Sequence, residues 1–302
     1  MTIISTEPNA PKVDFLWLEL TNRCNMQCAH CCVDSGPYSG NTDIMTTADW
    51  KRMLDESYNL GCRLVQFIGG EPTLNPDLPK LIAYAATRGY TEIQLYTNLY
   101  HLSREVVDAI VAHNVNVKTS VYGPDAKIHD AVTKHPGSFN RTIGNILGLI
   151  GNHVPVKAAV IEMAENEGAA LTTIAMLEDM GVEVHGYETA RKVGRANDGS
   201  GDMGELCGHC AGDTVFVGAD GRISPCTMST SWSIGSVSDG KSLTTVLDSP
   251  TSGIIRRQIG EATIGKQAVC TPKVCSPYDT CSPKHGPGPC APTGCIPCFP
   301  KG

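Results

Sequence analysis

The residues of this sequence with the most evident chemistry are three cysteines, Cys24, Cys28 and Cys31, which follow an apolar run in a C-x3-C-x2-C spacing. A loop of this kind can present three thiolates to one iron-sulfur cluster, because such clusters select soft sulfur ligands. Three protein ligands would leave the fourth iron of a 4Fe-4S cluster open for a small molecule. A zinc site is the plainer alternative. Zinc normally takes four ligands in paired groups, however, and only His30 and Cys32 stand nearby to complete one.

A second motif lies further along the chain, where an apolar run over residues 64–68 ends in Gly69-Gly70-Glu71-Pro72. Glycines let the backbone approach a ligand closely, and the Glu71 carboxylate could accept a hydrogen bond from an ammonium group. Together, the cysteine loop and this segment resemble the radical S-adenosylmethionine (SAM) enzymes. The resemblance implies that SAM binds at the open iron and that Gly69, Gly70 and Glu71 hold its amino group. It also implies that an electron from the cluster splits SAM into methionine and a 5'-deoxyadenosyl radical, which removes hydrogen from a C–H bond.

Hydrophobic periodicity predicts alternating strands and helices over the first two-thirds of the chain. Runs typical of strands lie at 15–20, 64–68, 92–96, 115–121, 154–161 and 182–187. Helical spacing of apolar residues predicts helices at 47–58, 76–87, 103–112, 139–150 and 168–180. This alternation indicates the α/β class, with parallel strands joined by right-handed crossovers. Six strands suit the partial (β/α)6 TIM barrel of the family that the motifs resemble.

Polar residues follow several of these strands, at the edge of the barrel where such folds carry their chemistry. By resemblance, Thr97, Asn98 and Ser120 would line the ribose and methionine parts of SAM, with Glu162 nearby after the fifth strand. The alternative is that these residues are turn or cap residues, which are common at strand ends.

The region beyond the predicted barrel is marked by its cysteines. A glycine-rich stretch, 194–201, separates it from the barrel, so the sequence predicts two domains, residues 1–194 and 195–302. Ala219-Asp220-Gly221 lies between two strand-like runs and predicts a hairpin that returns Cys226 beside Cys207 or Cys210.

This region resembles the SPASM and Twitch domains, and the resemblance implies at least one auxiliary 4Fe-4S cluster. The candidate ligands are Cys207, Cys210, Cys226, Cys270, Cys275 and Cys281, with Cys290, Cys295 and Cys298 ranked second. The tail is rich in proline and poor in apolar side chains, so cluster binding has to supply its folding energy. Its cysteine spacing departs from the SPASM pattern, which leaves the ligation and the number of auxiliary clusters open.

Composition and length exclude some classes of protein. The chain has 302 residues, 14 cysteines and a formal net charge of −7. No run approaches the roughly 18 apolar residues of a membrane span, and the first twelve residues lack the pattern of a signal peptide. We therefore expect a cytoplasmic protein with no membrane partner, whose cysteines bind metal rather than form disulfides. Cys62, in an apolar setting, is expected to be a core residue. Scattered basic residues and the acidic balance oppose nucleic-acid binding.

The substrate has to be argued from other features, because the fold does not name it. An acidic balance favours a cationic substrate. The first predicted strand begins near Asp14, which leaves no room for the separate amino-terminal peptide-recognition domain of many peptide maturases. The leading hypothesis is therefore an epimerase of an aminoglycoside antibiotic, of the type that converts neomycin C to neomycin B. A radical SAM peptide maturase that epimerises or cross-links its substrate is the second, and a non-enzymatic zinc-binding protein the third. Either enzyme implies a reductant such as flavodoxin or ferredoxin.

Epimerisation also needs a hydrogen donor on the face opposite the radical, and a thiol is the best side-chain donor because its S–H bond is weak. No cysteine lies between Cys226 and Cys270, but Ser249, an isostere of cysteine, marks a position where a donor would sit. The alternative is that Ser249 and Pro250 cap a helix over residues 251–259. Cys32 is the next candidate donor.

Overall fold

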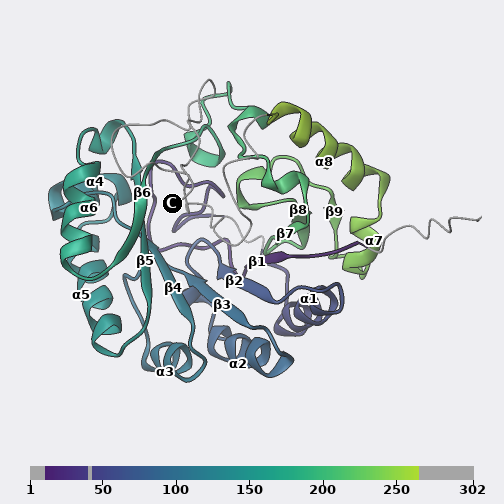
Figure 1. The fold of residues 1–302 in the computed structure, drawn as a ribbon, viewed down its shortest axis with the longest axis horizontal. Helices are drawn as coiled ribbons and strands as arrows, with labels where there is room; N and C mark the ends of the chain where they lie inside the picture. Colours follow the sequence, from purple (N-terminus) through teal and green to yellow (C-terminus); the bar gives the residue numbers. More distant parts are fainter. Residues whose placement is uncertain (1–10, 40–42, 265–302) are drawn as a thin grey trace, which may run out of the picture.

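A computed structural model describes residues 11–39 and 43–264 of the chain. Over these residues the centre of the molecule is one sheet of nine strands, in the order β6-β5-β4-β3-β2-β1-β7-β8-β9 (Figure 1). Every neighbouring pair from β6 to β7 is parallel, whereas β7–β8 and β8–β9 are antiparallel. The sequential order of β1 to β6, with helices along the outer side of the curved sheet, is that of a partial (β/α)6 barrel, as predicted.

The elements of the barrel lie close to their predicted positions. The strands are β1 (Phe15–Glu19), β2 (Leu64–Ile68), β3 (Glu92–Tyr96), β4 (Asn116–Ser120), β5 (Val156–Glu162) and β6 (Glu183–Thr189). The helices are α1 (Thr47–Asn59), α2 (Leu78–Arg88), α3 (Arg104–Ala112), α4 (Ala126–Thr133), α5 (Ser138–Gly151) and α6 (Ala170–Asp179). No helix within the described residues combines the length and the apolar character needed to cross a membrane.

Helix α4 is the barrel element that periodicity missed. It begins at Asp125, whose side chain accepts a hydrogen bond from the Ile128 backbone N–H at 3.0 Å. Its buried face includes His129 and Thr133 beside Val132, so the face is not marked by apolar residues. The helix ends at Lys134, which has a left-handed backbone with φ of +53°.

The first strand is buried on both faces, and its two faces belong to two different cores. Leu16 and Leu18 pack with Trp50, Leu54 and other side chains beneath the outer helices. The alternate residues of β1 face the other way, and they pack with Leu64, Ile68, Leu206, Phe216 and Ile259. The second core therefore joins the inner face of the barrel to the region after residue 194.

That later region also extends the barrel sheet. It contains β7 (Thr214–Val217), β8 (Arg222–Ser224), β9 (Gly235–Ser236), α7 (Leu243–Leu247) and α8 (Pro250–Ala262). Short 3-10 turns are η1 (Pro72–Leu74), η2 (Ala164–Asn166), η3 (Gly194–Ala196), η4 (Met203–Glu205), η5 (His209–Ala211) and η6 (Thr227–Ser229). Strand β7 pairs in parallel with β1, with Leu16 opposite Val215. A domain boundary at residue 194 therefore leaves the sheet continuous.

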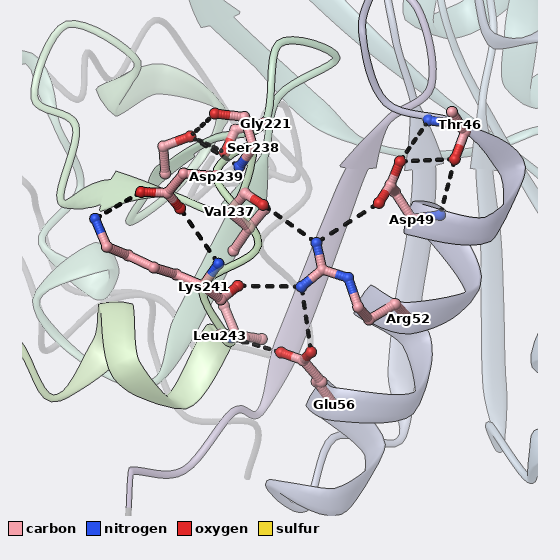
Figure 2. Close-up of polar contacts among 11 residues, drawn as sticks. Thr46, Asp49, Arg52, Glu56, Gly221, Val237, Ser238, Asp239, Lys241 and Leu243 are labelled. Carbon is pink, nitrogen blue, oxygen red and sulfur yellow. Dashed lines mark hydrogen bonds and ion pairs between the residues drawn. The ribbon is translucent and has the colours of Figure 1, made fainter.

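An arginine on α1 fixes the segment after β9 to the barrel (Figure 2). Arg52 donates hydrogen bonds to the carbonyl oxygens of Val237 at 3.2 Å and Lys241 at 3.1 Å, and it forms an ion pair with Glu56 at 3.3 Å. Glu56 in turn accepts a hydrogen bond from the Leu243 backbone N–H at 2.5 Å. The later region is thus attached both at the first strand and at the first helix.

Candidate active site

The cysteine loop after β1 covers the carboxyl ends of the barrel strands. Cys24, Cys28 and Cys31 line one pocket with further predicted site residues, namely Gly69, Gly70, Thr97, Asn98 and Ser120. Four strand ends, those of β1 to β4, contribute these residues. The pocket also contains Tyr122, which follows the fourth strand, and His30 of the cysteine loop. Sequence reasoning did not assign three further side chains of the lining to the site: Tyr96, His129 and Thr133.

The three thiols are held in a setting that suits metal ligands. Burial raises the pKa of Cys24 to about 12, and burial also raises the pKa values of Cys28 and Cys31. Backbone N–H groups point at two of the sulfurs, from Met26 to Cys24 Sγ at 3.4 Å and from Ser35 to Cys31 Sγ at 3.2 Å. Without metal these thiols keep their protons at neutral pH, so binding of a soft metal releases protons from the loop.

Helix α4, unpredicted from the sequence, supports the cysteine loop. The backbone N–H groups of Gln27 and Ala29 donate to the carbonyl oxygens of Thr133 at 3.1 Å and Val132 at 3.0 Å. These carbonyls belong to the last turn of α4, where helix carbonyls lack partners within the helix. The loop therefore satisfies the end of the helix, and the helix positions the residues between Cys24 and Cys31.

The two glycines of the second motif allow close packing of backbone on backbone. The Gly70 N–H donates to Thr21 O at 2.8 Å, and a Cβ at position 70 would lie 2.4 Å from Arg23 O. A Cβ at Gly69 would lie 2.8 Å from Thr21 O. Both glycines line the pocket, but the atoms that exclude a side chain here belong to the start of the cysteine loop.

The carboxylate of Glu71 is engaged inside the protein. Its Oε1 accepts from Thr73 Oγ1 and Thr97 Oγ1, both at 2.7 Å, and its Oε2 accepts from the Asn98 backbone N–H at 2.8 Å. The side chain is buried and does not line the pocket. A hydrogen bond between Glu71 and the amino group of SAM stays a prediction. The carboxylate ties β3 to η1 and holds Asn98, whose Nδ2 lies 3.9 Å from Cys24 Sγ.

The remaining predicted polar residues separate into two places. Ser120 lies in the pocket, where its hydroxyl is 2.7 Å from the hydroxyl of Tyr96. Glu162 lies outside the pocket lining, and its carboxylate accepts a hydrogen bond from the Gly168 N–H at 2.8 Å, which matches the cap alternative. Roles of the pocket residues toward SAM stay predictions.

Two buried histidines make the far side of the pocket neutral. Burial lowers the pKa values of His30 and His129 to about 4, so both imidazoles are uncharged at pH 7. His129 Nδ1 accepts a hydrogen bond from the Tyr122 backbone N–H at 3.3 Å, and the Tyr122 ring lies between the two histidines. The pocket therefore combines soft sulfur on one side with a largely uncharged aromatic wall on the other.

Part of this chain matches a known protein family. Residues 18–163 match the family model described as the Radical SAM superfamily. Over these residues, slightly less than half of the chain, the sequence is similar to the radical SAM superfamily. The match begins within β1 and ends just after β5, so it includes the cysteine loop, both glycines and Asn98.

Similar proteins match the same part of the chain, and a solved structure shares its fold. The PqqA peptide cyclase of Rhodopseudomonas palustris is 41% identical over 134 residues, which are 42% of this chain and 33% of that protein. The mycofactocin maturase MftC of Mycobacterium tuberculosis is 31% identical over 150 residues, 49% of this chain and 37% of that protein. Each alignment covers about a third of the relative's length. The crystal structure of Streptococcus suis SuiB bound to precursor peptide SuiA has a TM-score of 0.66 at 13% identity, covers 81% of this chain and 67% of that one, and supports the fold alone.

The superfamily implies a 4Fe-4S cluster and SAM, and the radical SAM region has a donor set that fits them. Three thiols face one pocket, two of them accept backbone N–H groups, and the amide of Asn98 lies beside the first. Among the described residues there is no group of three or more His, Cys, Asp or Glu side chains that could hold a metal ion.

Three later cysteines also come together. The hairpin of β7 and β8 returns Cys226 beside Cys210, as predicted, and the Cys210 thiol lies within hydrogen-bonding reach of Cys207 and Cys226. These contacts raise the pKa of Cys210 and lower the pKa of Cys226. Arg256 of α8 donates to Cys210 O at 3.1 Å and so holds this turn. The other candidates lie outside the described residues: Cys270, Cys275, Cys281, Cys290, Cys295 and Cys298.

The structure does not bring Ser249 to the pocket. Ser249 is the N-cap of α8, and its side chain accepts a hydrogen bond from the Ser252 N–H at 3.2 Å, with Pro250 in the first turn. This is the geometry of the capping alternative. Cys32, by contrast, is buried and lines the pocket. Cys62 is fully buried in the outer core, as expected, and its thiol donates to Leu64 O at 3.1 Å.

A second cavity, which the sequence did not suggest, lies beside the cysteine loop. It measures about 290 Å³, and its lining includes Cys32 and Val33 of the loop together with Glu19, Asp220 and Arg222. Glu19, the last residue of β1, is buried, and burial raises its pKa to about 8. Its Oε2 accepts from the Ala219 N–H at 3.1 Å, and its Oε1 has no hydrogen-bond partner within the part of the chain that the structure describes.

Proposed function

We propose that this chain is a radical SAM enzyme that holds a 4Fe-4S cluster on Cys24, Cys28 and Cys31. The observation that carries the proposal is the common pocket of these three thiols with Gly69, Gly70, Asn98 and Ser120 at the carboxyl ends of the barrel strands. In this arrangement SAM would bind at the open iron, against the Gly-Gly backbone. The chemistry that a reduced cluster with SAM would supply at these residues is a 5'-deoxyadenosyl radical able to remove hydrogen from a C–H bond.

The chain's own residues would support that chemistry by position and by exclusion of water. Glu71 fixes the backbone of Asn98, and Asn98 in turn bonds to Asn25 Oδ1 at 2.8 Å inside the cysteine loop. These hydrogen bonds fix the distance between strand β3 and the cysteine loop. The aromatic wall of Tyr96, Tyr122 and the neutral histidines keeps charge and bulk water away from a reactive radical.

For the substrate, we infer that a ribosomal peptide is favoured over an aminoglycoside. Two similar proteins are named for peptide or cofactor maturation, and the likeness in fold extends to a SuiB structure that contains a precursor peptide. Epimerisation of an aminoglycoside rests on the net charge of −7 and on chain size. The grouping of Cys207, Cys210 and Cys226 supports an auxiliary 4Fe-4S site. This site does not separate the two substrate classes, because both reactions occur in enzymes with such sites.

The first experiment tests the radical SAM reaction itself. Protein reconstituted with iron and sulfide under anaerobic conditions, then given SAM and dithionite, should release 5'-deoxyadenosine. Cys28→Ala should abolish the release, since it removes one of three cluster ligands. Cys62→Ala is the control, because it removes a cysteine that lies in the outer core and not in the pocket. No product from wild-type protein, or equal product from Cys28→Ala, would reject the proposal.

A second experiment separates the two substrate classes. The reconstituted enzyme is incubated with SAM, reductant and either neomycin C or a panel of precursor peptides encoded beside its gene, in deuterated water. A peptide substrate predicts faster 5'-deoxyadenosine release and a mass change in the peptide alone. Conversion of neomycin C to its epimer with one deuterium would instead establish the aminoglycoside reaction.

A further inference from the structure

The side chain of Arg195 binds the cysteine loop at several points. Its Nη1 donates to Cys28 O at 2.6 Å and its Nη2 to Ser35 O at 2.5 Å, and its Nε forms an ion pair with Asp34 at 2.9 Å. The backbone N–H of Arg195 also donates to Cys31 O at 2.9 Å. These four interactions span the part of the loop that carries the second and third cysteines of the motif.

The backbone next to Arg195 is shaped for this contact. Gly194 has φ of +56°, and a Cβ there would lie 2.3 Å from Cys31 O and 2.4 Å from Cys32 O. Only glycine lets the chain after β6 lie this close to the cysteine loop. The start of the glycine-rich stretch, which composition suggests is a linker, is therefore a packed part of the site.

Arg195 also places a positive charge beside the thiols. Its side chain is 19% exposed, so water screens the charge only in part. A cluster gains negative charge when it is reduced, and a fixed cation nearby favours the reduced form.

We propose that Arg195 is a positioning residue for the amino-terminal cluster: it clamps the Cys28–Ser35 part of the loop and raises the reduction potential of the cluster bound there. The fork of the guanidinium serves the first role, because it reaches two carbonyl oxygens and a carboxylate at once. Its charge serves the second. This inference rests on the proposed radical SAM function.

The test compares three variants of the full-length reconstituted protein. Arg195→Met keeps most of the side-chain length but loses both the fork and the charge, whereas Arg195→Lys keeps the charge and loses the fork. Arg191→Met is the matched control, because Arg191 is 18% exposed, lies four residues earlier and donates to Glu188 and to Glu205 O. For each protein we would measure the fraction of cluster whose EPR signal responds to SAM, its midpoint potential, and the melting temperature.

We expect Arg195→Met to lower the SAM-responsive fraction at least threefold and to shift the midpoint of the remaining cluster to a more negative potential. In Arg195→Lys, the midpoint potential should return closer to the wild-type value than the SAM-responsive fraction does. A general loss of stability does not produce this pattern. Arg191→Met should match the wild type in both. A midpoint in Arg195→Met equal to the wild-type value, or an equal shift in Arg191→Met, would overturn the inference. If wild-type protein itself shows no SAM-responsive cluster, the proposed function fails and not this inference alone.

Discussion

Replacing Glu19 with glutamine should change how the stability of the protein depends on pH. Glu19 ends β1, is buried, and has one carboxylate oxygen without a hydrogen-bond partner in the described part of the chain. Burial raises its pKa from the ordinary value of 4.5 to about 8. The folded protein therefore prefers the protonated carboxyl, whereas the unfolded chain releases the proton near pH 4.5. The stabilisation from this group is complete below pH 4.5 and is lost as pH rises toward 8.

The size of the effect follows from the pKa difference. Between these two pH values each pH unit costs about 1.4 kcal/mol of unfolding free energy, since one pKa unit corresponds to that energy. From pH 5.5 to 7.5 the wild type should therefore lose about 2 to 3 kcal/mol through Glu19. Glutamine has nearly the same shape and does not titrate, so the Glu19→Gln variant should not show this loss of unfolding free energy.

The assay is urea unfolding at pH 5.5, 6.5 and 7.5 under reducing, oxygen-free conditions. The decisive quantity is the difference in unfolding free energy between variant and wild type, because the titration of His30 and His129 cancels in it. We expect the difference to rise in favour of Glu19→Gln by about 2 to 3 kcal/mol across this range. Glu105→Gln is the control, since its carboxyl has a lowered pKa and stays ionised throughout. A difference that stays flat with pH would refute the assignment of a buried, proton-bearing Glu19.

Three further predictions concern packing and the later region. Arg52→Ala should lower the unfolding free energy by about 2 kcal/mol, because it leaves the carbonyls of Val237 and Lys241 without their donor, whereas Arg104→Ala, on a side chain that is 90% exposed, should change it by less than about 0.5 kcal/mol. Gly70→Ala should lower the unfolding free energy by about 2 kcal/mol, because the new Cβ would clash with Arg23 O. Its control, Gly144→Ala, has open space around it in α5 and should raise the unfolding free energy by about 0.5 to 1 kcal/mol. Thermal or urea unfolding measures these two variants and the two arginine variants. Arg256 donates hydrogen bonds to Cys210 O and Thr214 O, and so holds the turn that carries Cys207 and Cys210. Arg256→Met should therefore lower the amount of iron bound beyond the amino-terminal cluster, measured by iron analysis and EPR, yet leave 5'-deoxyadenosine release in place.

The barrel could be predicted from the sequence because its signals are local. Each predicted strand and helix of the barrel exists with ends shifted by two residues or fewer, since alternating apolar runs and turn residues report directly on their own segment. The return of Cys226 toward Cys210 was predictable for the same reason, from one hairpin. Helix α4 escaped because His129 and Thr133 form its buried face in place of apolar side chains.

The sequence predicts that the three cysteines of the loop lie together, but it does not reveal the residues that support the loop. The spacing of Cys24, Cys28 and Cys31 is a local pattern, whereas Arg195 reaches the same loop from more than 150 residues away. Glu71 accepts hydrogen bonds from Thr97 and Asn98, which follow the next strand, so its motif alone could not show these partners. Ser249 carried two local interpretations, and the geometry of its cap to Ser252 favours the structural one.

The central claim is that three cysteines hold a cluster whose remaining iron accepts SAM. The most direct measurement is Mössbauer or EPR spectroscopy of the reduced, reconstituted protein before and after SAM is added. The account predicts that SAM changes the spectrum of one cluster in the wild type, and that the change disappears in Cys24→Ala, Cys28→Ala and Cys31→Ala but persists in Cys62→Ala. A wild-type spectrum that SAM leaves unchanged, or a response that survives loss of these ligands, would contradict it.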